Sequence, residues 1–557
     1  MREKQRLRQP SPLRFESLER RSLLAGDVTA AVVDGRLVVT GDDFGNNVSI
    51  HRGDTPNEIV VQAGGSLRDL TTTTINGGSR FVATGVTGLI VHLGDGDDTL
   101  SVRDVDIAGD VVIDTGMGDD DILLNAGHGR IDPSIAIDYF YISRPVLVSG
   151  KLVVMAGAGN DLIHQGTSTI GGSEHISAGE GDDRVWLHDF AASSAAPAKP
   201  VEIGRSLTIN MGADDGINQQ PDSTRAAGVN EQLVVVPLSR YGDRLVARAL
   251  KVHGNLVVIH GKGTADLDLA GDVDGSALIV AGGGNDRINL GSKVGLVGGF
   301  NVGRNLLAHA GAGDDIVVQA SGHIKGDEIL VGGDGRDRVN IGSATPFDAV
   351  SVSPALFIDG TLRVNLGAGD DRLSQTNSSV SGSELVSMGA GADAVFLQSH
   401  NNFTDSFPSL ITVGQRLLID GQEGDDTVSL RQVAVGTTLD VDDRDGQSRV
   451  SMSFVQAMDV QIESGDGADT VELRYVTSPR VTLATGAGAD SVTRATSLID
   501  RFFADLGDGD DELNLGLPTT TLEFAADGGA GFDTLVGGER AELAGARNFE
   551  EFLPAST

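Results

Sequence analysis

The chain has 557 residues and a formal net charge of −37 at pH 7, because 79 acidic residues outnumber 42 basic ones. This surplus argues against a nucleic-acid partner, whose phosphates would be repelled. It suits divalent cations, although an acidic surface can also serve solubility alone. The absence of cysteine excludes disulfide bonds and thiolate metal sites. No run of 18 apolar residues occurs, so no membrane-spanning helix is expected.

Residues 1–27 form a basic, arginine-rich segment that we interpret as a targeting segment. Its apolar stretch is too short for the hydrophobic region of an ordinary signal peptide. The run FESLERRSLL, from Phe15 to Leu24, resembles the LEPR-x-LL sorting segment of large exported and surface proteins, best known from planctomycetes. Arg20 stands where that segment often has proline. The resemblance implies a secreted or cell-surface protein.

Residues 28–90 are predicted to form an N-terminal β cap. They contain strand-like runs such as RLVV (36–39) and EIVV (58–61). They also contain GDDFGNNVSI (41–50), a loose copy of a motif that recurs later. Residues 538–557 lack that motif and are predicted to form a C-terminal cap, as the ends of a repeat array require.

The motif is Gly-x-Gly-x-Asp, and it recurs throughout residues 91–537, where chance would give about one match. Several steps between copies are 21 or 22 residues, and steps of 33 or 34 fit the same unit with an insertion of 11 or 12 residues. A further copy, QEGDD (422–426), has lost its first glycine, and copies near Gly212, Gly261 and Arg444 have lost key residues. Intact copies begin at Gly94, Gly116, Gly157, Gly179, Gly282, Gly311, Gly333, Gly367, Gly389, Gly465, Gly486, Gly507 and Gly529.

The flanks of each glycine loop alternate between apolar and polar residues, as in LRVNL (362–366) and VEL (471–473). Alternation with Val, Ile and Leu is a strand signal. A fixed period of strand, glycine turn and strand indicates a solenoid, whose stacked coils share one core. Because one loop recurs per coil, successive strands should run parallel. We therefore predict an all-β fold, a parallel β-helix or β-roll with coils of about 21 to 22 residues.

The loops resemble the RTX, or hemolysin-type calcium-binding, repeat Gly-Gly-x-Gly-x-Asp-x-apolar-x, which GGDGRDRV (332–339) and GGAGFDTL (528–535) match in full. RTX arrays usually repeat every nine residues, so one motif per coil implies one metal column rather than two. In that family Ca²⁺ lies between stacked loops, bound by backbone carbonyls and the repeat aspartate. The candidate ligands carried over are Asp98, Asp120, Asp161, Asp183, Asp286, Asp315, Asp337, Asp371, Asp393, Asp426, Asp469, Asp490, Asp511 and Asp533.

Elementary chemistry agrees with this interpretation. Ca²⁺ takes six to eight hard oxygen ligands, and stacked carboxylates repel one another without a cation. The residue before the repeat aspartate is Asp or Asn in nine of the fourteen copies and could add an oxygen. The degenerate copies near Gly212, Gly261 and Arg444 are expected to break the column. The alternative is a ladder without metal, in which the aspartates bind backbone amides.

No catalytic motif stands out. The eleven histidines are scattered without a His-Glu-x-x-His pattern, and neither a Gly-x-Ser-x-Gly elbow nor a Walker loop occurs. Glu174, Glu328 and Glu384 occupy equivalent places in three repeats, which favours a structural or calcium-edge role over catalysis.

The function expected from the sequence is a secreted or cell-surface calcium-binding solenoid, structural or adhesin-like and not an enzyme. Its expected partners are calcium ions and cell-surface or extracellular-matrix components. The alternatives are a carbohydrate-active β-helix enzyme of lyase or epimerase type, and a structural solenoid without metal. Fold alone does not establish an enzyme. Only 4% of residues are aromatic, which disfavours a sugar-binding cleft.

Overall fold

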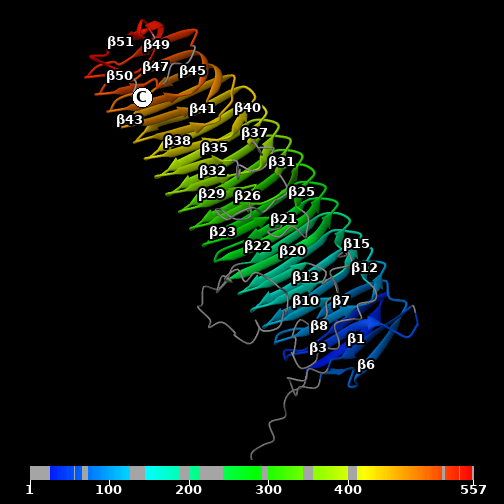
Figure 1. The fold of residues 1–557 in the computed structure, drawn as a ribbon. Helices are drawn as coiled ribbons and strands as arrows, with labels where there is room; N and C mark the ends of the chain where they lie inside the picture. Colours follow the sequence, from blue (N-terminus) through cyan, green and yellow to red (C-terminus); the bar gives the residue numbers. More distant parts are fainter. Residues whose placement is uncertain are drawn as a thin grey trace, which may run out of the picture.

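The computed structural model describes residues 26–55, 57–64, 73–125, 145–187, 200–212, 242–291, 299–342, 356–398, 411–516, 521–538 and 540–554. In these ranges the strands stack in register along a single rod (Figure 1). Almost all pairs are parallel, and partners lie one coil apart in sequence. The predicted all-β parallel solenoid is confirmed. Residues 1–25 lie outside the described residues, and so does most of the predicted targeting segment.

In the middle of the rod, most coils contribute one strand to each of three columns. In one coil the chain passes through β12 (Val146–Val148), β13 (Leu152–Ala158), the glycine loop and β14 (Leu162–Gln165). The next coil repeats this path, with Leu152 opposite Glu174 and Ile163 opposite Val185. The glycine loops therefore join the first column to the second and stack along one edge of the rod.

The first column precedes the glycine loops. Besides β13 it contains β2 (Arg36–Thr40), β7 (Gly88–His92), β10 (Val111–Met117), β16 (Glu174–Glu180), β19 (Leu207–Gly212), β21 (Leu256–His260), β23 (Ala277–Gly283), β26 (Leu306–Ala312), β29 (Glu328–Asp334), β32 (Leu362–Ala368), β35 (Glu384–Ala390), β38 (Leu417–Glu423), β41 (Thr438–Asp445), β43 (Asp459–Asp466), β45 (Thr477–Ala484), β47 (Leu498–Asp505), β49 (Glu523–Asp527) and β51 (Ala546–Arg547).

The second column follows the loops. Besides β14 it contains β3 (Asn47–Arg52), β8 (Thr99–Arg103), β11 (Asp121–Leu124), β17 (Arg184–Leu187), β20 (Asp243–Val252), β22 (Ala265–Val273), β24 (Arg287–Leu290), β27 (Ile316–Gln319), β30 (Arg338–Ile341), β33 (Arg372–Gln375), β36 (Ala394–Gln398), β39 (Thr427–Arg431), β42 (Arg449–Ser453), β44 (Thr470–Arg474), β46 (Ser491–Ala495), β48 (Glu512–Asn514), β50 (Thr534–Val536) and β52 (Glu551–Leu553).

The third column consists of short strands, and the long strands β20 and β22 serve both the second and third columns. Besides β12 its strands are β9 (Asp106–Ile107), β15 (Ser168–Ile170), β18 (Val201–Ile203), β25 (Phe300–Val302), β28 (Gly322–Ile324), β31 (Leu356–Ile358), β34 (Ser378–Val380), β37 (Ile411–Val413) and β40 (Val433–Val435).

The two ends depart from this pattern. At the N-terminal end β1 (Asp27–Val33) pairs antiparallel with β2, and β4 (Glu58–Ala63) pairs antiparallel with both β3 and β6 (Arg80–Thr84). The short strand β5 (Thr74–Ile75) pairs with β1. Parallel stacking already begins within the predicted cap, because β2 pairs with β7. At the other end, one turn of helix, α1 (Arg540–Leu543), precedes the last coil.

The core runs the length of the rod and is built from the inward positions of every strand. Val154, Ile176 and Ile209 are stacked neighbours and are fully buried. Alternation makes this possible, since successive side chains in a strand point to opposite faces. Each such side chain contributes roughly 1.5–3 kcal/mol by leaving water. A single coil has no second layer to cover these residues, so stability depends on stacking.

Candidate functional site

The repeat aspartates form a hydrogen-bonded ladder beneath the loop edge, interrupted where Ala265 and Ser448 stand in place of the aspartate. In each step a carboxylate oxygen, Oδ1, accepts a hydrogen bond from the backbone N–H of the equivalent residue one coil earlier. Asp98 N–H donates to Asp120 at 2.8 Å, and Asp490 N–H donates to Asp511 at 2.8 Å. All fourteen predicted residues accept such a bond, at 2.6–3.0 Å.

The second oxygen of these carboxylates, Oδ2, is buried as well. Within the described part of the chain it has no hydrogen-bond partner in Asp161, Asp183, Asp315, Asp337, Asp371, Asp393, Asp426, Asp511 and Asp533. In three other coils the core-facing residue five positions before the aspartate carries a hydroxyl group, namely Thr115, Ser464 and Thr485. Thr115 and Thr485 donate this hydroxyl to the backbone carbonyl oxygens of Ala156 and Leu506, at 3.0 and 2.9 Å.

Burial is the main cause of a large upward shift in the carboxyl pKa values. It raises the pKa of Asp98 and Asp183 to about 8, and the pKa of Asp161, Asp337 and Asp426 to about 7. The backbone hydrogen bonds act in the opposite direction, while neighbouring carboxylates add to the rise. Without a cation, these groups therefore favour the protonated form near neutral pH.

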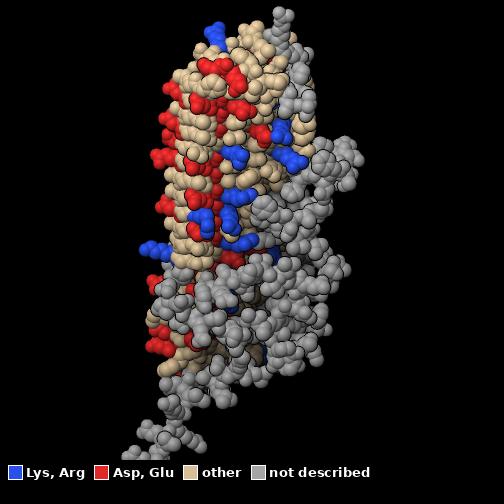
Figure 2. Space-filling view, turned by 60° about the vertical axis from the view of Figure 1, so that its left-hand side comes forward, with Lys and Arg blue, Asp and Glu red and all other residues tan. Residues whose placement is uncertain are grey.

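A second ladder runs in the opposite direction at the surface. The residue before the repeat aspartate accepts a hydrogen bond from the loop backbone of the following coil. Asp97 Oδ1 accepts from Asp119 N–H at 3.0 Å, and Asp510 Oδ1 accepts from Phe532 N–H at 2.9 Å. Acidic side chains gather along one edge of the rod (Figure 2). The Asp and Asn residues at this position thus connect adjacent loops by hydrogen bonds.

The loop glycines explain why the coils stack so closely here. Gly157 and Gly159 have φ values of +117° and +141°, which L side chains rarely adopt. A Cβ on Gly157 would overlap the carbonyl oxygen of Gly116 in the preceding loop. The carbonyl oxygen of a glycine in one loop therefore lies against the glycine of the next loop.

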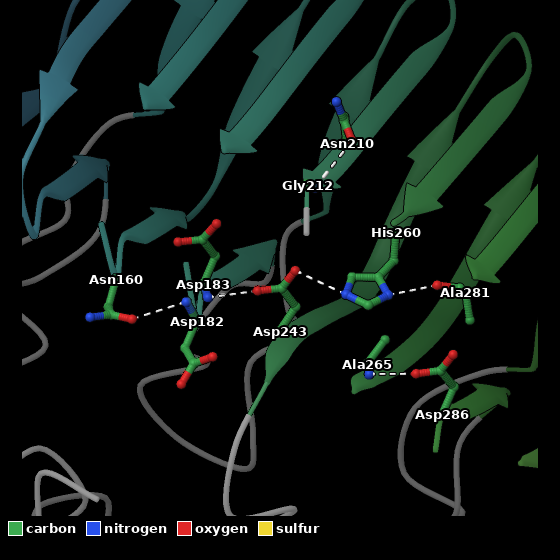
Figure 3. Close-up of polar contacts among 10 residues, drawn as sticks. All are labelled: Asn160, Asp182, Asp183, Asn210, Gly212, Asp243, His260, Ala265, Ala281 and Asp286. Atoms are coloured by element: carbon green, nitrogen blue, oxygen red, sulfur yellow. Dashed lines mark hydrogen bonds and ion pairs between the residues drawn. The ribbon is translucent and has the colours of Figure 1, made fainter. Parts of the chain in front are cut away.

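The predicted break near Gly212 does not occur in the ladder. Residues 213–241 lie outside the described residues, and Asp243 then takes the ladder position. Its Oδ1 accepts from Asp183 N–H at 2.7 Å (Figure 3). The motif did not predict Asp243 as a ladder residue, because it lies 31 positions after Gly212. Its local sequence was a usable signal, since Asp-Arg also occurs at 183–184 and 337–338.

The copies near Gly261 and Arg444 have lost the repeat aspartate, so the ladder of carboxylates is interrupted at these two coils, as predicted. Ala265 and Ser448 occupy the ladder positions. Five residues earlier, at the core-facing position before the loop, stand His260 and Asp443, both buried. Ser448 Oγ donates to Asp443 Oδ2 at 2.6 Å. The sequence motif does not predict His260 or Asp443, because it begins after the position that they occupy.

The ladder also has defined ends. Asn46, from the loose N-terminal copy, donates its backbone N–H to Asp98 Oδ1 at 2.6 Å. At the other end Asp533 donates its N–H to Glu550 Oε2 at 2.8 Å. The predicted cap segments thus supply the terminal partners of the ladder.

Glu174, Glu328 and Glu384 lie away from the loops. They begin strands of the first column and point into the core, where they are fully buried. Gln165 and Gln375 donate to Glu174 and Glu384 at 3.4 and 3.2 Å. Burial raises the pKa of Glu174 and Glu328 to about 8 and that of Glu384 to about 7. Their placement agrees with a structural role and not with a position at the loop edge.

The oxygen atoms at the loops are suitable ligands for a hard cation. Buried carboxylate oxygens and glycine carbonyl oxygens are the kinds of ligand that Ca²⁺ binds. Within the described ranges, no three His, Asp or Glu side chains come together as a ready metal site. A cation would therefore have to take several of its ligands from the backbone.

Comparisons with protein-family models, with curated proteins and with solved structures found no match. In the described part of the chain, no helix has the length and apolar character needed to cross a membrane.

Proposed function

We propose that the chain is a calcium-binding β-solenoid that acts as a structural, adhesin-like rod outside the cell. The observation that carries this proposal is the column of buried carboxylates. In many of the coils that the structure describes, their second oxygen contacts neither a hydrogen-bond partner nor solvent. Carboxylates stacked about 4.8 Å apart cannot all be ionised without positive charge between them. The column must therefore take up cations or protons when the rod is folded.

Three considerations support calcium over protons. The loops resemble RTX repeats, two of them over the full unit. Ca²⁺ tolerates irregular sets of six to eight oxygens, which carboxylates and backbone carbonyls can supply together. The net charge of −37 would also concentrate divalent cations around the rod. One motif per coil supports a single column of ions.

A rod without metal is the second candidate, and a specific observation favours it. Oδ1 of each repeat aspartate already binds the backbone, and Oδ2 can face the core side of the loop. A Cβ placed on Gly332 or Gly528 would lie 2.5 or 2.8 Å from Oδ2 of Asp337 or Asp533. In that arrangement protons would neutralise the carboxyls, and the loops would be turns only.

Export to the cell surface is part of the proposal and rests on the resemblance of Phe15–Leu24 to a sorting segment, which lies outside the described residues. A rod with regular, acidic, repeated faces suits a structural or adhesive role. Cell-surface or matrix components are the partners this role requires, and we propose no catalytic activity.

Paired loop variants test calcium binding directly. We expect Asp511→Asn in the full chain to lower the number of Ca²⁺ ions bound, measured by isothermal titration calorimetry and by Tb³⁺ luminescence. Asparagine keeps the oxygen that accepts from Asp490 N–H, so the ladder is retained. The control is Asp508→Asn, an exposed aspartate of the same loop. The proposal fails if the unmodified chain binds no calcium, or if only the control variant lowers binding.

A further inference from the structure

In one coil the ladder position has no carboxyl group, and a buried histidine lies close to the ladder. Ala265 stands in register between Asp243 and the coil of Asp286, and it donates its N–H to Asp286 Oδ1 at 2.7 Å. Ala265 itself offers no carboxylate to the ladder. The change coincides with a histidine at position 260, five residues earlier, in the core-facing row.

His260 lies directly beneath the loop and contacts the ladder. It lies opposite Gly212 of the preceding coil, where the register shifts by one residue, and the residue before it, Ile259, lies opposite Val280 of the following coil. Its Nε2 lies 3.2 Å from Asp243 Oδ2, and both side chains are fully buried. Its Nδ1 lies 2.6 Å from the carbonyl oxygen of Ala281 (Figure 3). The imidazole therefore bridges two neighbouring coils.

The positions of the protons follow from these contacts. A carbonyl oxygen can only accept, so His260 Nδ1 carries a hydrogen. Asp243 Oδ1 accepts from the backbone of Asp183, which leaves Oδ2 to face His260 Nε2. If neither of these facing atoms held a proton, two lone pairs would oppose each other in a buried place. One proton must therefore lie between Asp243 and His260.

The surrounding charges favour this proton. The acidic groups whose charges act on His260 are Asp243 on β20 and Asp286 in the glycine loop of the next coil. Burial by itself lowers the pKa of His260. The hydrogen bond and the charge of Asp243, together with the Ala281 carbonyl, outweigh burial and raise the pKa above its ordinary value.

We propose that Asp243 and His260 form a resident proton site, which neutralises this coil as a bound cation would neutralise the others. The cation column is then divided into two segments, Asp98 to Asp183 and Asp286 to Asp533. The division rests on the proposed calcium function, whereas the proton site does not.

Histidine NMR on the full chain tests the proton site. With ¹³C-labelled histidine, in EDTA, His260 is assigned as the signal missing from His260→Gln. We expect it to stay protonated well above pH 6.5, the ordinary midpoint. In Asp243→Asn the amide still accepts from Asp183 and can donate to a neutral imidazole, so the midpoint should fall by a unit or more. A midpoint at or below 6.5, or no change in Asp243→Asn, would overturn the proposal.

Calcium stoichiometry tests the division of the column. His260→Leu leaves Asp243 buried without its proton partner, so we expect one more Ca²⁺ bound at saturation than in the unmodified chain. The double variant with Asp243→Asn is the control and should bind no extra ion. If the unmodified chain binds calcium and His260→Leu binds no more, the division is wrong. If the unmodified chain binds no calcium, the proposed function fails. The NMR experiment tests the proton site in that case too, and also if His260→Leu does not fold.

Discussion

Replacing Gly282 by alanine should destabilise the rod by roughly 3 kcal/mol, because the substitution combines an unfavourable backbone conformation with a steric clash. Gly282 has a φ of +103°, and a Cβ there would overlap the carbonyl oxygen of Gly261 in the preceding loop. Neither atom can move freely, since both belong to backbone that is fixed by stacking. The measurement is the urea midpoint of the full chain, followed by far-UV circular dichroism.

The adjacent residue provides a matched control. Gly283 lies in the same loop, but its φ angle lies outside the left-handed region. A Cβ at this position would meet no heavy atom within 4 Å. We expect Gly283→Ala to be neutral or to stabilise the rod by less than about 1 kcal/mol. Equal effects of the two substitutions would contradict the close loop stacking described above.

In EDTA, the folded rod should become less stable as the pH rises from 5 to 9. The folded pKa is about 8 for Asp98 and Asp183, and about 6 for Asp393 and Asp511, against an ordinary value of 3.8. Folding therefore takes up protons. The resulting stability is fully present below about pH 4 and is lost as pH passes through 6 to 8. Melting temperatures across this range measure the effect.

Saturating calcium should remove this pH dependence, because a cation stabilises the ionised carboxylates and lowers their pKa. A comparable alkaline loss with and without calcium would mean that the ions bind elsewhere. Melting temperatures in EDTA that stay constant or rise from pH 5 to 9 would contradict the burial-driven shifts themselves.

Much of the fold was predictable because the same local rules recur in every coil. Apolar alternation in runs such as LRVNL fixed the inward faces, and the glycine loops marked where each strand of the first column ends. The three-column path was less accessible. Strands of the third column, such as β15 and β34, have only three residues, too few to show a period.

The candidate site was predictable as a set of residues but not as a set of contacts. The motif identified every repeat aspartate with its own glycine loop. It could not show that Oδ1 binds the backbone of the preceding coil, because that contact spans 21 to 60 residues. For a related reason, the motif did not identify Asp243 and His260 as part of the site. A long insertion separates Asp243 from its glycine, and His260 acts from a position that is apolar in most coils.

A calcium-dependent thermal melt of the full chain tests the central claim most directly. Unfolding is followed by far-UV circular dichroism at pH 7.5 in EDTA, and then across a Ca²⁺ titration with Mg²⁺ as the control. The account predicts that calcium raises the melting temperature with its concentration and that magnesium does so far less, since binding to the folded state alone stabilises it. A melting temperature that does not respond to calcium would contradict the cation column and leave a hydrogen-bonded ladder neutralised by protons.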